Sequence, residues 1–210
     1  MSAAPAPAPE TPWGRWTQAI GAKPPVRGGG RTLAARPLSP CGRDVPSKEA
    51  DMSIPSRLSQ YLEHHGARYE VCRHEHSRSS AETARVAHVP LNQLAKAVLL
   101  EDEQICVIAV LPADRSVMPH EVAQLLGRQE LRLVEEPRLG QLLDGCEPGA
   151  VPAVGMAWGM ETVVDDELEQ RELVYLEAGD HEQLLRLTQA QFHALMRGAK
   201  WGRISRVQMH

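Results

Sequence analysis

The chain has 210 residues, of which 42% are hydrophobic and 24% charged, and its formal net charge is −4 at pH 7. This length can form one domain with its own core but not two large ones. From Met52 onward, 16 Lys and Arg residues face 23 Asp and Glu residues. The composition therefore excludes a generally basic nucleic-acid binder, and no apolar run approaches the roughly 20 residues that a membrane span needs.

Residues 1–51 differ in composition from the rest of the chain. They hold 9 of the 16 prolines and 6 of the 16 glycines, without helical or strand periodicity. Such a segment buries too little apolar surface to offset the cost of ordering it. We predict a disordered Pro/Gly-rich extension over residues 1–51 and one domain over residues 52–210. A second interpretation stays open, in which residues 1–51 are upstream sequence and Met52 is the natural start.

The first predicted helix begins at Pro55. Leu58, Tyr61 and Leu62 recur at the spacing of one helix face, and Gly66 is a typical stop signal. A short strand is predicted over residues 68–73.

The second predicted helix is short and has small residues on its inner face. Ser79 and Glu82 have the spacing of a capping box, and the helix ends before Pro90.

Two apolar runs, residues 94–100 and 105–111, are joined by an acidic turn. The second run has no polar alternation, which is typical of a strand buried on both faces. The pattern predicts a central hairpin covered by helices. After it, we expect helices from Pro119 and over residues 136–143.

Strands and helices also alternate without regular periodicity in the last third of the chain. Residues 144–155 contain too many turn formers for regular structure. A capping box at Thr188 predicts a last helix. The sequence therefore predicts an α/β domain with a mixed sheet. Further strands are expected near residues 131–134, 161–164, 173–177 and 184–187.

Lys96 is the first candidate for a functional side chain. It lies near the start of the first central strand among apolar residues, so its amine either extends to solvent or points into a polar pocket. The Gly149–Pro152 segment allows backbone amides to approach a ligand closely, although such loops are also common as structural turns. Asp165 follows a predicted strand, and residues 179–182 form a polar loop. Either segment can also be interpreted as a solvent-exposed turn with no functional role.

Cysteine and histidine patterns argue against a metal or thiol enzyme. Cys72, His74 and His76 alternate like metal ligands, but no second pair completes a site. Cys146 lies beside Asp144 and another acid, which disfavour its thiolate. The four cysteines show no paired spacing, so we expect no disulfide framework and a reducing, cytoplasmic location.

Several of these segments together resemble the YbaK/ProX-like family of aminoacyl-tRNA deacylases, which includes the editing domains associated with prolyl-tRNA synthetase. The resemblance runs from about Ser53 to Met196, with no block missing or out of order. The segments that carry it are His74 or His76, Ser80–Ala84, Leu94–Leu100, Val110–Ala113, Cys146–Pro152, Val163–Asp165 and Glu177–His181.

The resemblance implies a fold and an activity. The fold would be a mixed, mostly antiparallel sheet curled into a partial barrel with flanking helices. The activity would be hydrolysis, in trans, of the ester of a mischarged aminoacyl-tRNA. It would require neither metal nor cofactor, and its partners would be the 3′ end of an aminoacyl-tRNA and an aminoacyl-tRNA synthetase, with no membrane or DNA partner.

The resemblance also implies site residues. Lys96 matches the family's lysine and is the expected catalytic residue. Relatives of the cysteinyl-tRNA type carry a different glycine loop, so the edited amino acid does not carry over. The residues expected to bind substrate are His74, His76, Gly149, Ala150, Val151, Pro152, Asp165 and His181, although the sequence leaves open which of the two early histidines matches the family motif.

These residues suggest a mechanism, and a competing function stays open. No Ser-His-Asp set is evident. We expect Lys96 to contact the carbonyl or the terminal ribose-phosphate, and amides near Gly149 and Ala150 to hold the aminoacyl group or oxyanion while water or a substrate group attacks. The main rival is a non-hydrolytic module of the same fold that binds tRNA or a synthetase. A hydrolase of small esters or amides is a third possibility.

Overall fold

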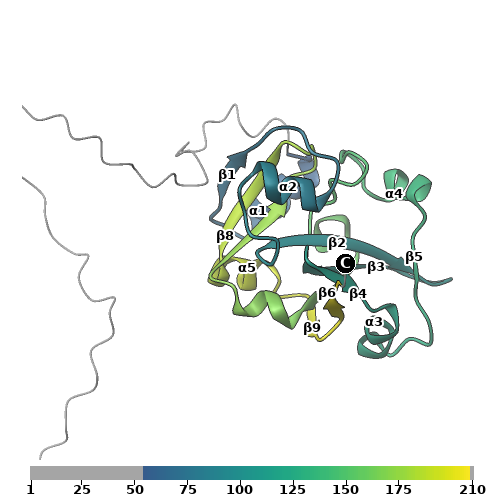
Figure 1. The fold of residues 1–210 in the computed structure, drawn as a ribbon. Coiled ribbons are helices and arrows are strands. Elements are labelled where there is room, and N and C mark those ends of the chain that lie inside the picture. The colour runs from purple at the N-terminus through teal and green to yellow at the C-terminus, as the bar shows by residue number, and fades with distance from the viewer. Residues whose placement is uncertain (1–53, 209–210) are drawn as a thin grey trace, which may run out of the picture. The chain divides into compact units, whose positions relative to one another are not determined.

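The structure is a computed structural model that describes residues 54–208 (Figure 1). The predicted disorder of residues 1–51 falls outside the described residues and stays a prediction. Within the described range, no helix combines the length and apolar character that crossing a lipid bilayer requires.

The first three elements follow the sequence signals closely. Helix α1 (Ser56–His64) begins directly after Pro55 and buries Leu58 and Leu62. Strand β1 (Glu70–Arg73) comes next. Helix α2 (Ser80–Val86) begins where the capping box predicted, because the Ser79 hydroxyl accepts a hydrogen bond from the Glu82 amide.

The central hairpin consists of β2 (Leu94–Glu101) and β3 (Cys106–Pro112). They pair antiparallel with Lys96 opposite Leu111. β3 is buried along almost its whole length, as its unbroken apolar run predicted.

The remaining elements complete the domain. Three short strands, β4, β9 and β10, were not predicted from the sequence. The other elements are β4 (Arg115–Val117), α3 (Pro119–Leu126), β5 (Arg132–Leu133), α4 (Glu136–Leu142), the 3-10 helix η2 (Gly155–Trp158), β6 (Glu161–Asp165), the 3-10 helix η3 (Asp166–Gln170), β7 (Leu173–Glu177), β8 (Gln183–Thr188), α5 (Gln189–Leu195), β9 (Lys200–Gly202) and β10 (Ser205–Val207).

Eight strands form one mixed sheet in the order β1-β8-β7-β2-β3-β6-β9, with β5 paired to β2. The β2 pairs with β3 and β5, and the β8 pairs with β1 and β7, are antiparallel. Parallel pairing joins β7 to β2, β3 to β6 and β6 to β9. The expected mixed, mostly antiparallel sheet is confirmed, and its curl into a partial barrel stays a prediction.

Helices cover both faces of this sheet. On one face, α1 and α5 pack on a core that includes Leu58 and Phe192. On the other face are two smaller clusters, one under α2 that contains Leu94 and one under α3 that contains Leu100 (Figure 1). Because alternate strand residues share a face, Lys96 lies on β2 between these two clusters.

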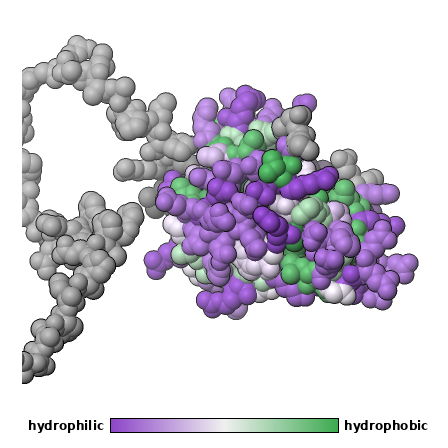
Figure 2. All heavy atoms as spheres, turned by 60° about the horizontal axis from the view of Figure 1, so that its bottom comes forward, coloured by the Kyte–Doolittle hydropathy of each residue, from purple (hydrophilic) through white to green (hydrophobic). Residues whose placement is uncertain are grey.

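The surface turned forward in Figure 2 is mostly hydrophilic, with apolar residues in small separate areas. Leu91, Leu133 and Val207 are the large hydrophobic side chains of the described chain that are exposed. Scattered residues of this kind are normal for a protein surface.

Candidate active site

Lys96 is half-buried, and its amine is held by the backbone. Its Nζ donates to the carbonyl oxygen of Ala113 at 3.3 Å. Burial lowers the pKa of Lys96, and the nearby Asp114 carboxylate partly opposes this shift. Residues 54–208 contain one other lysine, Lys200, which forms an ion pair with Glu161 at 3.0 Å.

No carboxylate of the described chain lies within ion-pair distance of Lys96. Its ammonium group therefore has no fixed counter-ion and can bind a ligand's oxygen atoms.

Glu177 lies beside Lys96 in the sheet. Strands β2 and β7 are parallel, with Leu94 opposite Tyr175 and Ala95 opposite Leu176. One residue further along both strands, Lys96 and Glu177 therefore occupy neighbouring positions on the same face. The sequence motif contained Glu177, but we did not predict it as a site residue.

Gly149 and His181 meet at the end of β7. Gly149 has φ +92°, and a Cβ added to it would lie 3.4 Å from both Cε1 and Nε2 of the His181 imidazole. His181 Nε2 lies 2.9 Å from the carbonyl oxygen of Pro148. Because a carbonyl can only accept, Nε2 carries the hydrogen. His181 is thus fixed against the glycine turn.

The segment before α2 holds His181 from the other side. The Ser77 amide donates to the His181 carbonyl oxygen at 3.1 Å. The ring of His76 packs edge-on against that of His181, with centroids 5.5 Å apart. Two predicted site residues, His76 and His181, are therefore brought together although 105 positions separate them in the sequence.

Glu177 is joined to the same group by hydroxyl contacts. Its Oε1 lies 2.9 Å from Thr83 Oγ1, which lies 2.7 Å from Ser77 Oγ. Burial raises the pKa of Glu177 to about 6, and the Thr83 hydroxyl and His181 act in the opposite direction. A carboxyl group with such a perturbed pKa beside a lysine is a candidate functional group.

The loop over residues 149–152 contributes backbone rather than side chains. Ala150, Val151 and Pro152 are buried. The Ala150 amide already donates to the Glu147 carbonyl oxygen at 3.0 Å, so in this conformation it is not free to hold a ligand. The Gly149 amide meets no acceptor within the described part of the chain.

The side chains of two other predicted residues are held by contacts of their own. His74 bonds through Nδ1 to the Glu75 carbonyl oxygen at 2.8 Å and lines a hollow with Arg73 and Arg85. Asp165 is at the end of β6, and both its oxygens accept backbone amides, from Glu167 at 3.0 Å and from Ile204 at 3.1 Å.

Comparisons with known proteins identify the family and support the fold. The family model described as an aminoacyl-tRNA editing domain matches residues 74–195, more than half of the chain. This chain belongs to the aminoacyl-tRNA editing domain family. The match includes Lys96, Gly149, Glu177 and His181, so the expected family is confirmed. No curated protein matches the sequence at a significant level.

Solved structures share the fold of this editing domain. The hypothetical protein APE2540 is 22% identical with a TM-score of 0.64, and the match covers 72% of this chain and 100% of that one. A protein described as "a putative trans-editing enzyme for prolyl tRNA synthetase" is also 22% identical, with a TM-score of 0.62 and coverage of 71% and 95%. At these identities the likeness shows the fold.

The cysteines of the editing domain do not provide a nucleophile at this site. Burial, reinforced by the Asp144 carboxylate, raises the pKa of Cys146 to about 12. Cys106 and Cys146 are free thiols. Among residues 54–208, no three His, Cys, Asp or Glu side chains are grouped to hold a metal ion.

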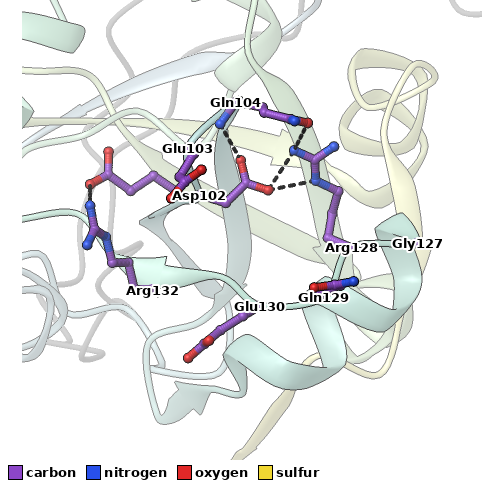
Figure 3. A pocket seen from close by; sticks show the side chains of 9 residues that line it. Asp102, Glu103, Gln104, Gly127, Arg128, Gln129, Glu130 and Arg132 are labelled. Carbon is purple, nitrogen blue, oxygen red and sulfur yellow. Dashed lines mark hydrogen bonds and ion pairs between the residues drawn. The ribbon is translucent and has the colours of Figure 1, made fainter.

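One hollow of the editing domain lies away from Lys96. It measures about 630 Å³ and is at the opposite end of β2, beside the turn to β3 and the end of α3 (Figure 3). Arg128 crosses it to reach Asp102, and Arg132 reaches Glu101. Both arginines of this hollow therefore already pair with carboxylates, and its lining includes none of the predicted site residues.

Proposed function

We propose that this editing domain hydrolyses the ester bond of a mischarged aminoacyl-tRNA in trans. The observation that carries the proposal is the placement of Lys96, which is half-buried and has no carboxylate of residues 54–208 within ion-pair distance. The register of β2 and β7, extended by one pair, puts Glu177 beside it on the same face of the sheet. Family membership supplies the substrate class, an aminoacyl-tRNA.

Lys96 would bind the oxygen-rich end of the substrate. A lysine ammonium is a compact cation with three donors, suited to a phosphate or to a carbonyl that gains negative charge. Ala113 holds it through one weak, neutral contact at 3.3 Å. A ligand phosphate or oxyanion would therefore replace this contact at little cost, because charge-assisted hydrogen bonds are the stronger ones.

The Gly149 turn would hold the reacting carbonyl. The amides of Gly149 and Val151 both have no acceptor among the described residues, but Gly149 is exposed whereas Val151 is buried. Gly149 also has no side chain to block the approach of a ligand. His181 borders the same turn. One donor of this kind contributes on the order of a hundredfold to a thousandfold in rate. Because the Ala150 amide is occupied by Glu147, we assign the oxyanion contact to Gly149.

Water is the proposed nucleophile, or a group on the substrate itself. The raised pKa of Cys146 removes the thiol from consideration at neutral pH. The hydrolysis needs no metal in this scheme. Selection would come from the size of the site, since a small pocket admits a small wrong amino acid and excludes a larger correct one.

The proposed partners are the 3′ end of an aminoacyl-tRNA and an aminoacyl-tRNA synthetase, and the proposed location is the cytoplasm. One relative in fold is described as acting for prolyl-tRNA synthetase. His76 and His181 are proposed substrate contacts because they border the Gly149 turn. His74, Asp165 and the side chains of Ala150, Val151 and Pro152 remain predicted contacts without such support.

The rival function is a non-hydrolytic module that binds tRNA or a synthetase. It would need Lys96 for binding alone, with no reason for an open amide at Gly149. A panel of tRNAs charged with alanine, serine, threonine, cysteine and proline decides between the two. Selective deacylation by the wild type that is lost in Lys96→Ala and kept in Lys200→Ala supports the proposal. Binding of tRNA without hydrolysis of any member supports the rival.

A further inference from the structure

Three buried side chains and the backbone carbonyl of His181 form one chain of polar contacts beside the candidate site. The exposed fractions of Ser77, Thr83, Glu177 and His181 are 0%, 0%, 4% and 6%. Glu177 Oε1 contacts Thr83 Oγ1 at 2.9 Å, Thr83 contacts Ser77 Oγ at 2.7 Å, and Ser77 Oγ lies 3.4 Å from the His181 carbonyl oxygen. Groups this buried must satisfy their hydrogen bonds mainly within the chain.

The direction of this chain depends on one proton, because each hydroxyl has a single hydrogen. When Glu177 is neutral, its carboxyl can donate to Thr83, Thr83 to Ser77, and Ser77 to the His181 carbonyl. When Glu177 is ionised it only accepts, so the hydrogens of Thr83 and Ser77 turn toward it. The His181 carbonyl then keeps only the Ser77 amide. The Ser79 carbonyl, 3.1 Å from Thr83 Oγ1, is a competing acceptor that already receives the Thr83 amide at 2.8 Å.

His181 needs this support because its backbone is strained. Its φ is +59°, in the left-handed region that a residue with a side chain rarely adopts. Such a conformation is unfavourable and persists only where neighbours fix it. Its ring borders Gly149 and donates to Pro148. A weaker hold on the His181 backbone would therefore shift the glycine turn.

We propose that Glu177 is a positioning residue of the editing site, and that its protonation state controls how firmly Ser77 and Thr83 hold His181 against the Gly149 turn. The inference rests on the proposed function for its effect on rate. The structural switch itself does not depend on hydrolysis.

The surroundings of Glu177 bring its pKa into the pH range in which enzyme assays are normally run. Burial raises its pKa to about 6, Asp180 adds to this shift, and His181 opposes it. Lys96 occupies the neighbouring position on β2. From α2, the uncharged Thr83 faces the carboxyl group. His76 adds a further titratable group beside His181, so the test must separate Glu177 from the histidines.

The kinetic test compares Glu177→Gln with wild type across pH 5 to 7.5. A glutamine amide donates to Thr83 as the neutral acid does, at every pH. The ratio of kcat/KM, variant over wild type, should rise about threefold or more over this range, the effect of one hydrogen bond. Glu177→Leu should lose about tenfold at all pH values. Glu70→Gln, which removes a surface carboxylate paired with Arg186, should give a flat ratio. A flat ratio for Glu177→Gln would overturn the proposal.

A second readout does not need activity. The amide resonance of Ser77 reports the hydrogen bond to the His181 carbonyl. Its chemical shift should change with an inflection near pH 6 in wild type and in Glu70→Gln, and that inflection should be absent in Glu177→Gln. If wild type hydrolyses no aminoacyl-tRNA but the inflection depends on Glu177, the proposed function fails and the switch stands. An inflection that survives in Glu177→Gln assigns the titration to a histidine and refutes the switch.

Discussion

Gly149 lies directly beside His181, because a Cβ added at position 149 would lie 3.4 Å, an ordinary van der Waals distance, from two atoms of the imidazole. At φ +92° an alanine is strained whatever space it has. Gly149→Ala should therefore cost about 1–3 kcal/mol of stability and lower kcat/KM for deacylation by more than tenfold. Urea unfolding and steady-state kinetics measure the two effects.

Gly159 offers a matched control for this substitution. It has φ +72°, and an added Cβ would meet nothing within 4 Å. Gly159→Ala should carry a similar backbone cost without the loss of activity. Equal loss of activity in both variants would mean that general destabilisation, and not the contact with His181, explains the effect.

The stability of the domain should depend on pH through Glu177. Because burial raises its pKa to about 6, the folded state binds this proton more tightly than the unfolded chain. Stability from Glu177 is thus fully present below its ordinary pKa and is lost as pH rises through 6. Glu177→Gln removes this dependence. The Tm of Glu177→Gln minus the Tm of wild type should increase by about 4–8 °C from pH 4.5 to pH 7. This increase corresponds to about 2 kcal/mol in the free energy of unfolding. A pH-independent difference in Tm would contradict this reasoning.

The sequence predicted the elements whose signals are local. Ser79 and Thr188 both cap helices as expected, with hydroxyls that accept from the Glu82 and Gln191 amides. Strands β4, β9 and β10 were missed because each has three residues and little apolar character, for example Lys200–Gly202. Their formation depends on distant partners, and such pairing leaves no periodicity to detect.

In the candidate site, too, residues with a local sequence signal were predicted and those that depend on distant contacts were not. Lys96 and Gly149 were predicted, and family resemblance supplied His181. Glu177 was not predicted as a site residue because a single acid at a strand end resembles any exposed terminus. Its burial depends on the packing of α2, whose Thr83 hydroxyl donates a hydrogen bond to the Glu177 carboxylate. A charged residue that ends an otherwise apolar strand, as in Leu173–Glu177, was the available signal.

Lys96 should react with amine reagents at lower pH than Lys200. Burial lowers the pKa of Lys96, so a larger fraction of its amine is neutral and nucleophilic at pH 8 than in an ordinary lysine, whereas the Lys200 amine is engaged in an ion pair with Glu161. Labelling followed by peptide mass spectrometry gives both rates in one sample. A non-hydrolysable aminoacyl-tRNA analogue should protect Lys96 and leave Lys200 unchanged. Protection of neither lysine would count against a substrate contact at Lys96.

Cys146 should be dispensable for catalysis. With a pKa of about 12 it is almost entirely the neutral thiol at pH 7.5, and the thiolate is the reactive form. Cys146→Ser should retain kcat/KM within about threefold, a difference of less than 1 kcal/mol. Iodoacetamide at pH 7.5 should leave deacylation unchanged. Rapid inactivation of wild type, prevented in Cys146→Ser, would show that this thiol is accessible and close to the reaction.

Asp165 offers a test between a substrate contact and a structural role. Both oxygens accept backbone amides, one from Glu167 and one from Ile204 just before β10, and the residue is 1% exposed. In Asp165→Asn the side-chain NH₂ must face one of these donors, so a buried hydrogen bond is lost at a cost of about 1–3 kcal/mol. The exposed neighbour Asp166, whose pKa is raised by desolvation and by adjacent acids, makes Asp166→Asn the control, with no loss of stability.

Comparing unfolding with kinetics separates the two roles of Asp165. If it ties β6 to the segment before β10, Asp165→Asn should lower the urea midpoint while the folded fraction keeps the kcat/KM of wild type. If Asp165 binds substrate, as the family resemblance implies, kcat/KM should fall by more than the loss of folded protein explains. KM should then change more than kcat, because a contact that is equally strong in the ground and transition states contributes to binding alone. The structure favours the first result, since Asp165 is 1% exposed and each of its oxygens already accepts a backbone amide, so a ligand cannot reach it without a rearrangement.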